Sequence, residues 1–292
     1  MKVGSLFTGI GGFDLGFERQ GFEIAWQCEI DAQARAVLGQ KWPDVRLVDD
    51  VHLVGTDQPF DMCPPECEEG CEREIECIGI AELQDELAID VLVGGFPCQD
   101  ISAAGDRWGN REGTNGTRSG LWWEFARIIQ EVSPEWVVIE NTGRLRNGRS
   151  GTDLRAVVEE LDRLAYVGWG AVLDAAAFGL PARRPRVFLV ARKRRDAGSL
   201  SDGQGLAEHF LRDDPGCVVL ERTGQPLATD AGATRPTPGT FRLLTPLECE
   251  RALGFPDNWT AGLANSARRH LCGNAVAVPV AEWIASRIKA FA

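Results

Sequence analysis

The stretch Val3-Gly4-Ser5-Leu6-Phe7-Thr8-Gly9-Ile10-Gly11-Gly12, close to the start of the chain, joins an apolar run to a glycine-rich turn. The run predicts a buried strand from Val3 to Phe7, and Phe13 to Glu18 then begins a helix. A second apolar run, Glu23 to Cys28, predicts another strand. Strand, glycine turn, helix and strand in this order predict a βαβ unit of an α/β fold.

An acid follows the second predicted strand: Glu29 stands 20 positions after Gly9. In nucleotide-binding βαβ units the glycines let the backbone approach a ligand, and a carboxylate about 20 residues on accepts bonds from ribose hydroxyls. The spacing differs from the dinucleotide pattern G-x-G-x-x-G, which favours an adenosine cofactor other than NAD; a tight turn without a ligand is the alternative. A third short strand is predicted over residues 44–54, where Asp49 or Asp50 would face the adenine or its ribose.

A cysteine follows the apolar run in Asp90-Val-Leu-Val-Gly-Gly-Phe-Pro-Cys-Gln-Asp-Ile-Ser102. Val91 to Val93 predict a buried strand that stops at two glycines, so Cys98 would lie just past its carboxyl end. Ligands of open α/β sheets bind outside those ends, and Pro97 fixes the backbone beside the thiol. A nucleophile and a buried structural thiol are equally compatible with this stretch alone.

Polar groups also stand at the ends of two other predicted strands, after one and before the other. The strand Trp136 to Ile139 ends in Glu140, and Ala182-Arg183-Arg184-Pro185-Arg186 runs into the apolar strand Val187 to Val190. A glutamate and a pair of arginines should therefore open onto the crevice of Cys98.

Composition bounds the class of protein. The chain has 292 residues, of which 44% are hydrophobic, enough for one large domain or two unequal ones. No apolar run reaches membrane-spanning length and no signal-peptide pattern opens the chain, so a soluble intracellular protein is expected.

Charge is unevenly distributed along the chain. The net charge of −12 arises in residues 1–90, with 20 acids and 6 bases, whereas seven bases and no acid occupy residues 183–195. This basic strip could engage phosphates, and a solvated charged turn is the alternative.

Nine cysteines without an export signal favour reduced thiols, metal ligands or catalysis over a disulfide framework. Four of them interrupt the predicted sheet in an acidic insertion, with the spacing C-x₃-C-x₃-C-x₅-C: Cys63, Cys67, Cys71 and Cys77. They predict either a structural zinc site or a loop of free or regulatory thiols. Residues 101–120, rich in Gly, Ser, Thr, Asn and Arg, predict a mobile functional loop behind Cys98.

Six motifs stand together in an order that resembles the DNA (cytosine-5) methyltransferase family. They are Phe7-x-Gly9-x-Gly11-Gly12, Pro97-Cys98-Gln99, Glu140-Asn141, Arg184-x-Arg186, Leu244-Thr245-Pro246-x-Glu248-Cys249 and Gly273-Asn274-Ala275-Val276. The resemblance covers nearly the whole chain except the cysteine insertion and residues 193–240. It implies a Rossmann-like class I methyltransferase sheet with a small target-recognition domain.

The resemblance also implies a reaction: transfer of a methyl group from S-adenosylmethionine to carbon 5 of a flipped cytosine in double-stranded DNA. Cys98 matches the nucleophile that adds to carbon 6, because carbon 5 is a poor nucleophile until the ring becomes an enamine. Glu140 matches the glutamate that holds the N3/N4 edge and shares a proton with N3. Arg184 and Arg186 match the arginines that face O2 and the nearby phosphate.

By the same resemblance, a cofactor pocket and a domain division are expected. The pocket would comprise Phe7, Gly9, Gly11, Gly12, Glu29 on the ribose, Ile30, Asp50, Pro97, Leu121, Asn274 and Val276. Residues 1–192 with 241–292 would form a discontinuous catalytic and cofactor-binding domain, interrupted by the cysteine-rich insertion at 56–86, and residues 193–240 the target-recognition region. The C-terminal helix Val278 to Ile288 would pack beside the first strand.

The sequence departs from the family at two places: Ala182 replaces a frequent Gln, and Thr142 the usual Val. Ala182 puts one polar contact near the active site in doubt.

The alternative functions are a C5 methyltransferase of structured RNA, which would share the ring chemistry, and a catalytically silent DNA-binding relative. An NAD oxidoreductase leaves Cys98 and Glu140 unexplained. A monomeric, cytoplasmic, prokaryotic or phage-encoded protein of a restriction–modification system is expected, with DNA and no membrane as its partner.

Overall fold

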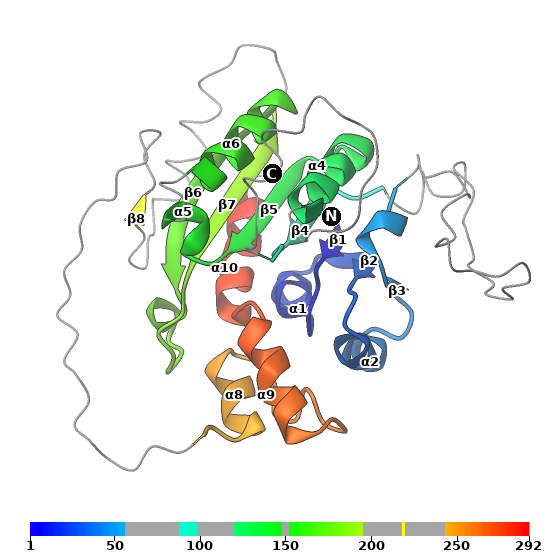
Figure 1. Cartoon of the computed structure of the whole chain (residues 1–292), viewed down its shortest axis with the longest axis vertical. Coiled ribbons are helices and arrows are strands. Elements are labelled where there is room, and N and C mark those ends of the chain that lie inside the picture. The colour runs from blue at the N-terminus through cyan, green and yellow to red at the C-terminus, as the bar shows by residue number, and fades with distance from the viewer. Residues whose placement is uncertain (56–87, 98–119, 148–151, 195–217, 220–242, 292) are drawn as a thin grey trace, which may run out of the picture.

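Strands that are separated by helices along the chain form one eight-stranded sheet, as the computed structural model shows (Figure 1). The structure describes residues 1–55, 88–97, 120–147, 152–194, 218–219 and 243–291. Its single sheet has the order β3-β2-β1-β4-β5-β7-β6-β8. The strands are β1 (Lys2–Leu6), β2 (Glu23–Cys28), β3 (Arg46–Val48), β4 (Val91–Gly94), β5 (Trp136–Asn141), β6 (Tyr166–Asp174), β7 (Pro185–Lys193) and β8 (Val218–Val219).

The pairing directions divide the sheet into two parts. From β3 to β5 every pair is parallel, whereas β7 lies antiparallel between β5 and β6. The carboxyl ends of β1, β2, β4 and β5 therefore meet at one edge. At that edge the start of β7 pairs with the end of β5, through Val187 and Asn141.

Alternation along the strands explains how both faces of the sheet are covered. Val91 and Val93 of β4 belong to one buried cluster and Leu92 to the other, as the two-residue period of a strand requires. The helices and 3₁₀ turns are α1 (Gly12–Arg19), α2 (Ala32–Lys41), η1 (Val51–Leu53), α4 (Leu121–Val132), α5 (Arg144–Asn147), α6 (Thr152–Arg163), η5 (Ala175–Phe178), α8 (Pro246–Ala252), α9 (Asn265–Asn274) and α10 (Val278–Phe291).

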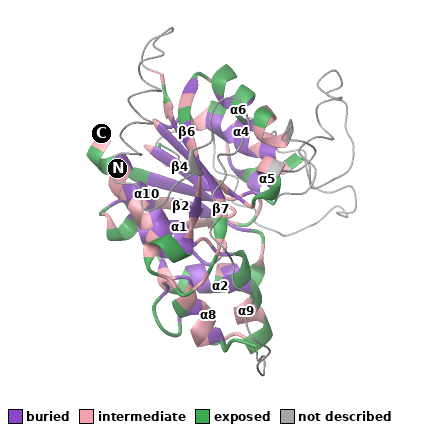
Figure 2. Ribbon diagram, turned by 90° about the vertical axis from the view of Figure 1, so that its left-hand side faces the viewer, coloured by how far each residue is buried: buried purple, intermediate pink, exposed green. Residues whose placement is uncertain are grey.

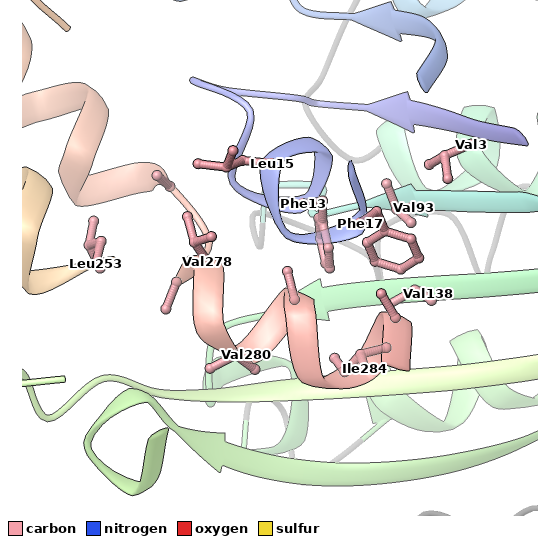
Figure 3. Packing of buried hydrophobic residues seen from close by; sticks show 14 of the residues in the cluster. Val3, Phe13, Leu15, Phe17, Val93, Val138, Leu253, Val278, Val280 and Ile284 are labelled. Atoms are coloured by element: carbon pink, nitrogen blue, oxygen red, sulfur yellow. The ribbon is translucent and has the colours of Figure 1, made fainter. Parts of the chain in front are cut away.

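One face carries α1, α2 and α10 and the other carries α4 and α6, so the sheet lies buried between two helical layers (Figure 2). In the first layer, Phe13 and Phe17 of α1 and Ile284 of α10 gather over Val93 and Val138 of the sheet (Figure 3). The C-terminal helix thus closes the core that the first βαβ unit begins.

The sequence interpretation of the strands needs one correction. Residues 44–54 were predicted as one strand, but only Arg46–Val48 pair with β2, and Val51–Leu53 form the 3₁₀ turn η1. The side chain of Asp50 caps this turn by accepting a bond from the His52 amide, which ends the extended backbone. In the part of the chain that the structure describes, no helix has the length and apolar character that a bilayer crossing requires.

Candidate active site and cofactor turn

The turn between β1 and α1 is shaped by glycines, as the sequence predicted. Gly11 adopts a φ of 81°, in the left-handed region that favours glycine. Position 12 requires glycine for another reason, because a Cβ there would lie only 2.4 Å from the carbonyl oxygen of Val276. The structure therefore brings the N-terminal glycines and Val276, predicted members of one pocket, into direct contact.

Glu29 fastens this turn to the end of β2. Its Oε2 accepts a bond from the Gly9 amide at 2.7 Å, and its Oε1 accepts one from the Asp31 amide at 2.8 Å. Each oxygen keeps a second acceptor position, because a carboxylate offers about four lone-pair sites in all. The chemistry of this donor and acceptor set fits the hydroxyls of an adenosine ribose.

Ile30 and Asp50 are two further residues of the predicted cofactor pocket. Ile30 is 74% exposed, a large apolar side chain on the surface next to the turn. Asp50 caps η1, and its Oδ1 also lies 2.7 Å from Nδ1 of His52. An apolar surface beside a carboxylate fits a flat base with polar edge atoms.

The remaining predicted cofactor residues surround the same strand ends. Phe7 and Leu121 are partly buried and pack against one hydrophobic cluster, with Phe7 stacked on Phe125 at 6.4 Å between ring centroids. Pro97 and Asn274 are exposed, at the loop after β4 and the end of α9. These residues could hold the adenosine and methionyl parts of a cofactor.

Glu140, the predicted acid of the site, lies at the carboxyl end of β5. Its Oε1 lies 3.0 Å from Nε of Arg186, and the carboxyl is only 13% exposed. Burial raises the pKa of Glu140 to about 7, although Arg186 and Arg184 act to lower it. A carboxyl with this pKa exchanges its proton near neutral pH, as a general acid or base requires.

The loop after β4 approaches Glu140 closely. A Cβ on Gly95 would lie 2.8 Å from Oε2 of Glu140, so a glycine is needed at that position. Cys98, three residues further on, lies outside the described residues. Glu140 and Arg186 are brought together beside the segment that leads to it.

Asn141 is a positioning residue whose role the sequence reasoning missed. Its Nδ2 donates to the carbonyl oxygen of Phe96 at 2.9 Å, and its Oδ1 accepts from the Thr142 amide at 2.8 Å. The side chain is buried, so this bond fixes the backbone two residues before Cys98. The Glu140-Asn141 pair was the available signal, but the partner carbonyl lies 45 residues away in sequence.

Arg184 lies between the strand ends and the C-terminal segment. Its Nη2 donates to the carbonyl oxygens of Gly273 and Ala275 at 2.7 and 2.9 Å, on either side of Asn274. Burial and the neighbouring Arg186 lower the pKa of this guanidinium, and Glu140 acts in the opposite direction. Arg184 therefore holds the segment predicted to bind the cofactor beside the start of β7.

An open pocket of about 340 Å³ lies beside these arginines. The start of β7, α8 and α9 line it, with four arginines and no acidic residue: Arg183, Arg184, Arg186 and Arg269, together with Ala182, Pro185, Leu244, Cys249, Ala252, Leu253, Cys272 and Gly273. A concave surface of this charge is suited to a phosphate group.

The predicted metal ligands Cys63, Cys67, Cys71 and Cys77 lie outside the described residues. Among the residues that are described, no three His, Cys, Asp or Glu side chains are grouped as a metal site would need. Three other cysteines are free thiols: Cys28, Cys249 and Cys272.

Comparison with known proteins identifies the family. The Bacillus subtilis Type II methyltransferase M2.BsuMI is 29% identical over 328 residues, covering 99% of this chain and 75% of the relative. The Picosynechococcus Type II methyltransferase M.AquIA is 32% identical over 201 residues, covering 66% of this chain and 72% of the relative. The fold is shared with a DNA modification methyltransferase encoded within an E. coli prophage, at a TM-score of 0.65, 19% identity and 99% coverage of both chains. The model of the C-5 cytosine-specific DNA methylase family matches residues 1–202 and 218–290, and the chain belongs to this family of DNA (cytosine-5) methyltransferases.

Proposed function

We propose that this chain methylates carbon 5 of a cytosine that is flipped out of double-stranded DNA, with Cys98 as the nucleophile. A cytosine inside a duplex is closed to attack, so the target must leave the base stack and enter the crevice at the strand ends. The thiolate of Cys98 adds to carbon 6, which makes carbon 5 nucleophilic. After methyl transfer, carbon 5 loses its proton and the thiolate leaves carbon 6.

The single observation that best supports this proposal is the buried Glu140. With a pKa of about 7 it holds a proton near neutral pH, and this proton can be donated to N3 of cytosine as the thiolate adds. Arg186, 3.0 Å away, orients the carboxyl and supplies positive charge for O2 or a nearby phosphate. Arg184 shares that charge and holds the segment around Asn274.

The residues around the glycine turn fit S-adenosylmethionine, which the methyltransferase family implies. When bound, this cofactor supplies a methyl group on a positively charged sulfur. Glu29 would accept bonds from its ribose hydroxyls, Ile30 would cover one face of its adenine and Asp50 would bind the edge. Gly9, Gly11 and Gly12 let the backbone approach it, and Phe7, Pro97, Leu121, Asn274 and Val276 complete the pocket.

The biological setting belongs to the same proposal. The similar relatives are named Type II methyltransferases, so we assign this chain to the modification of DNA in a restriction–modification system. Residues 193–240 stay the predicted target-recognition region, and the cysteine-rich insertion stays predicted as either a structural zinc site or a loop of free or regulatory thiols. Metal analysis of the purified protein decides between these two: four titratable thiols without zinc would exclude the zinc site.

Transfer of labelled methyl groups tests the function. Purified protein is incubated with labelled S-adenosylmethionine and either genomic DNA or structured RNA. Label on cytosine of DNA, absent with Glu140→Gln or Cys98→Ser, is expected. Transfer to RNA alone would favour the RNA methyltransferase, and binding of DNA without any transfer would favour the silent relative.

A further inference from the structure

Trp259 lies far from the glycine turn in sequence but touches it in the fold. Its Nε1 donates to the carbonyl oxygen of Ile10 at 2.8 Å, and the two residues are 249 positions apart. Ile10 is fully buried between Gly9 and Gly11, and Trp259 is 7% exposed. A buried backbone carbonyl needs a hydrogen-bond donor, and the indole N–H of Trp259 supplies one to the Ile10 carbonyl in the middle of the turn.

The ring of Trp259 belongs to an aromatic cluster behind the turn. Trp42 packs edge-on against it at 5.7 Å between ring centroids, and Phe255 lies at 5.5 Å. A Cβ on Gly11 would lie 2.4 Å from the Trp42 ring, so the cluster presses directly on the turn. Lys41 places its Nζ 4.6 Å from the Trp259 ring centroid, on the outer side of the same cluster.

A buried carboxylate holds the segment that carries Trp259. Glu250 of α8 is fully buried and accepts bonds from the amide and the hydroxyl of Thr260. Arg268 of α9 completes the arrangement, with Nη2 at 2.8 Å from Oε1 of Glu250. The residue next to Trp259 is therefore fixed to two helices, which gives the indole a fixed direction.

We propose that Trp259 is a positioning residue for cofactor binding: its N–H holds the Ile10 carbonyl and so sets the Gly9–Gly12 backbone to receive the cofactor. This inference rests on the proposed function of the turn as the S-adenosylmethionine site. It connects that site to the α8–α9 segment, which follows the predicted target-recognition region in sequence. The Glu29 bond to Gly9 orders one end of the turn, and the Trp259 bond orders its middle.

The test compares two equal substitutions in the same cluster. Trp259→Phe removes the N–H but keeps an aromatic ring, so the dissociation constant for S-adenosylmethionine should rise about 5- to 10-fold, the effect of one lost hydrogen bond of ordinary strength. Trp42→Phe is the control, because its N–H donates to Glu18 of α1 and not to the turn. Its dissociation constant should rise less than that of Trp259→Phe, because Trp42→Phe removes ring atoms that pack against Gly11 but leaves the bond to the Ile10 carbonyl in place.

Kinetics separate positioning from loss of fold. In Trp259→Phe the KM for S-adenosylmethionine should rise, while kcat and the KM for DNA stay near their original values. Equal binding by Trp259→Phe and the original protein, or equal weakening in Trp42→Phe, would overturn the inference. If Trp259→Phe does not fold, benzothienylalanine at position 259 replaces only the N–H by sulfur and decides the matter in the same assay. If the original protein binds no S-adenosylmethionine, the proposed function fails.

Discussion

Replacing Glu140 by Gln should stabilise the ligand-free protein at alkaline pH. The folded-state pKa of Glu140 is about 7, above the ordinary glutamate value of 4.5, because burial disfavours the charged carboxylate. As pH rises, the unfolded chain gives up this proton first, so ionisation favours unfolding between pH 4.5 and about 7. Gln resembles the protonated acid and carries no such cost.

The magnitude follows from the two pKa values. A difference of about 2.5 units at ~1.4 kcal/mol each gives about 3 kcal/mol in favour of Glu140→Gln above pH 7. Less than ~1 kcal/mol should remain at pH 5, because that pH lies only slightly above the unfolded-state pKa of 4.5 and ionisation there favours the unfolded chain only weakly. Asp14, whose pKa burial raises to about 6, is present in both proteins and cancels in the difference.

Urea unfolding at pH 5, 6, 7 and 8 measures this difference. The free energy of unfolding of Glu140→Gln minus that of the original protein should grow by roughly 2–3 kcal/mol across the series. Glu159→Gln is a suitable control, because Glu159 is 62% exposed in its ion pair with Arg155. A difference that is constant with pH would refute the assignment of a near-neutral pKa to Glu140.

Two further substitutions test neighbouring parts of the site. Asn141→Ala should lower the free energy of unfolding by about 1–3 kcal/mol and slow methylation, because the buried Phe96 carbonyl loses its donor. Asn141→Asp also loses this donor but keeps the contact with the Thr142 amide. Equal activity of Asn141→Ala and the original protein in the methyl-transfer assay would contradict the positioning role of Asn141. Arg269→Gln should weaken DNA binding and reduce the slope of log K against log salt by about 1, the value of one lost phosphate contact. Arg155→Gln on α6 is the control. If both variants keep the original slope in a salt titration, the arginine-lined pocket does not contact the DNA phosphates.

The first βαβ unit could be predicted because its signals are local. The glycines of the turn and Glu29 are close in sequence, and the Gly9–Glu29 bond spans only 20 residues. The continuous apolar run Val91 to Val93 likewise predicted a buried strand, and the structure confirms it, with the two valines in one buried cluster and Leu92 in the other. The Rossmann-like α/β fold that the six motifs implied is also confirmed.

Contacts between distant segments could not be predicted in this way. The carbonyls bound by Arg184 lie 89 and 91 residues away, and the one bound by Trp259 lies 249 away. Backbone carbonyls leave no mark in the sequence, so no residue type indicated these partners. The predicted extent of the third strand, residues 44–54, was wrong for a local reason. The Asp50 side chain caps the 3₁₀ turn η1, and such capping competes with the extended backbone of a strand.

Attack of Cys98 on carbon 6 of cytosine can be tested by trapping the covalent adduct. In DNA that carries 5-fluorocytosine at the sites of methylation, a fluorine replaces the hydrogen on carbon 5. This fluorine cannot leave as a proton does, so after methyl transfer the covalent adduct cannot resolve. With S-adenosylmethionine present, the original protein should form a complex with this DNA that survives denaturing electrophoresis, and Cys98→Ser should form none. An equal amount of complex with Cys98→Ser would show that another residue is the nucleophile. Label transfer by the original protein to ordinary DNA without any trapped complex would show that no covalent adduct forms at carbon 6.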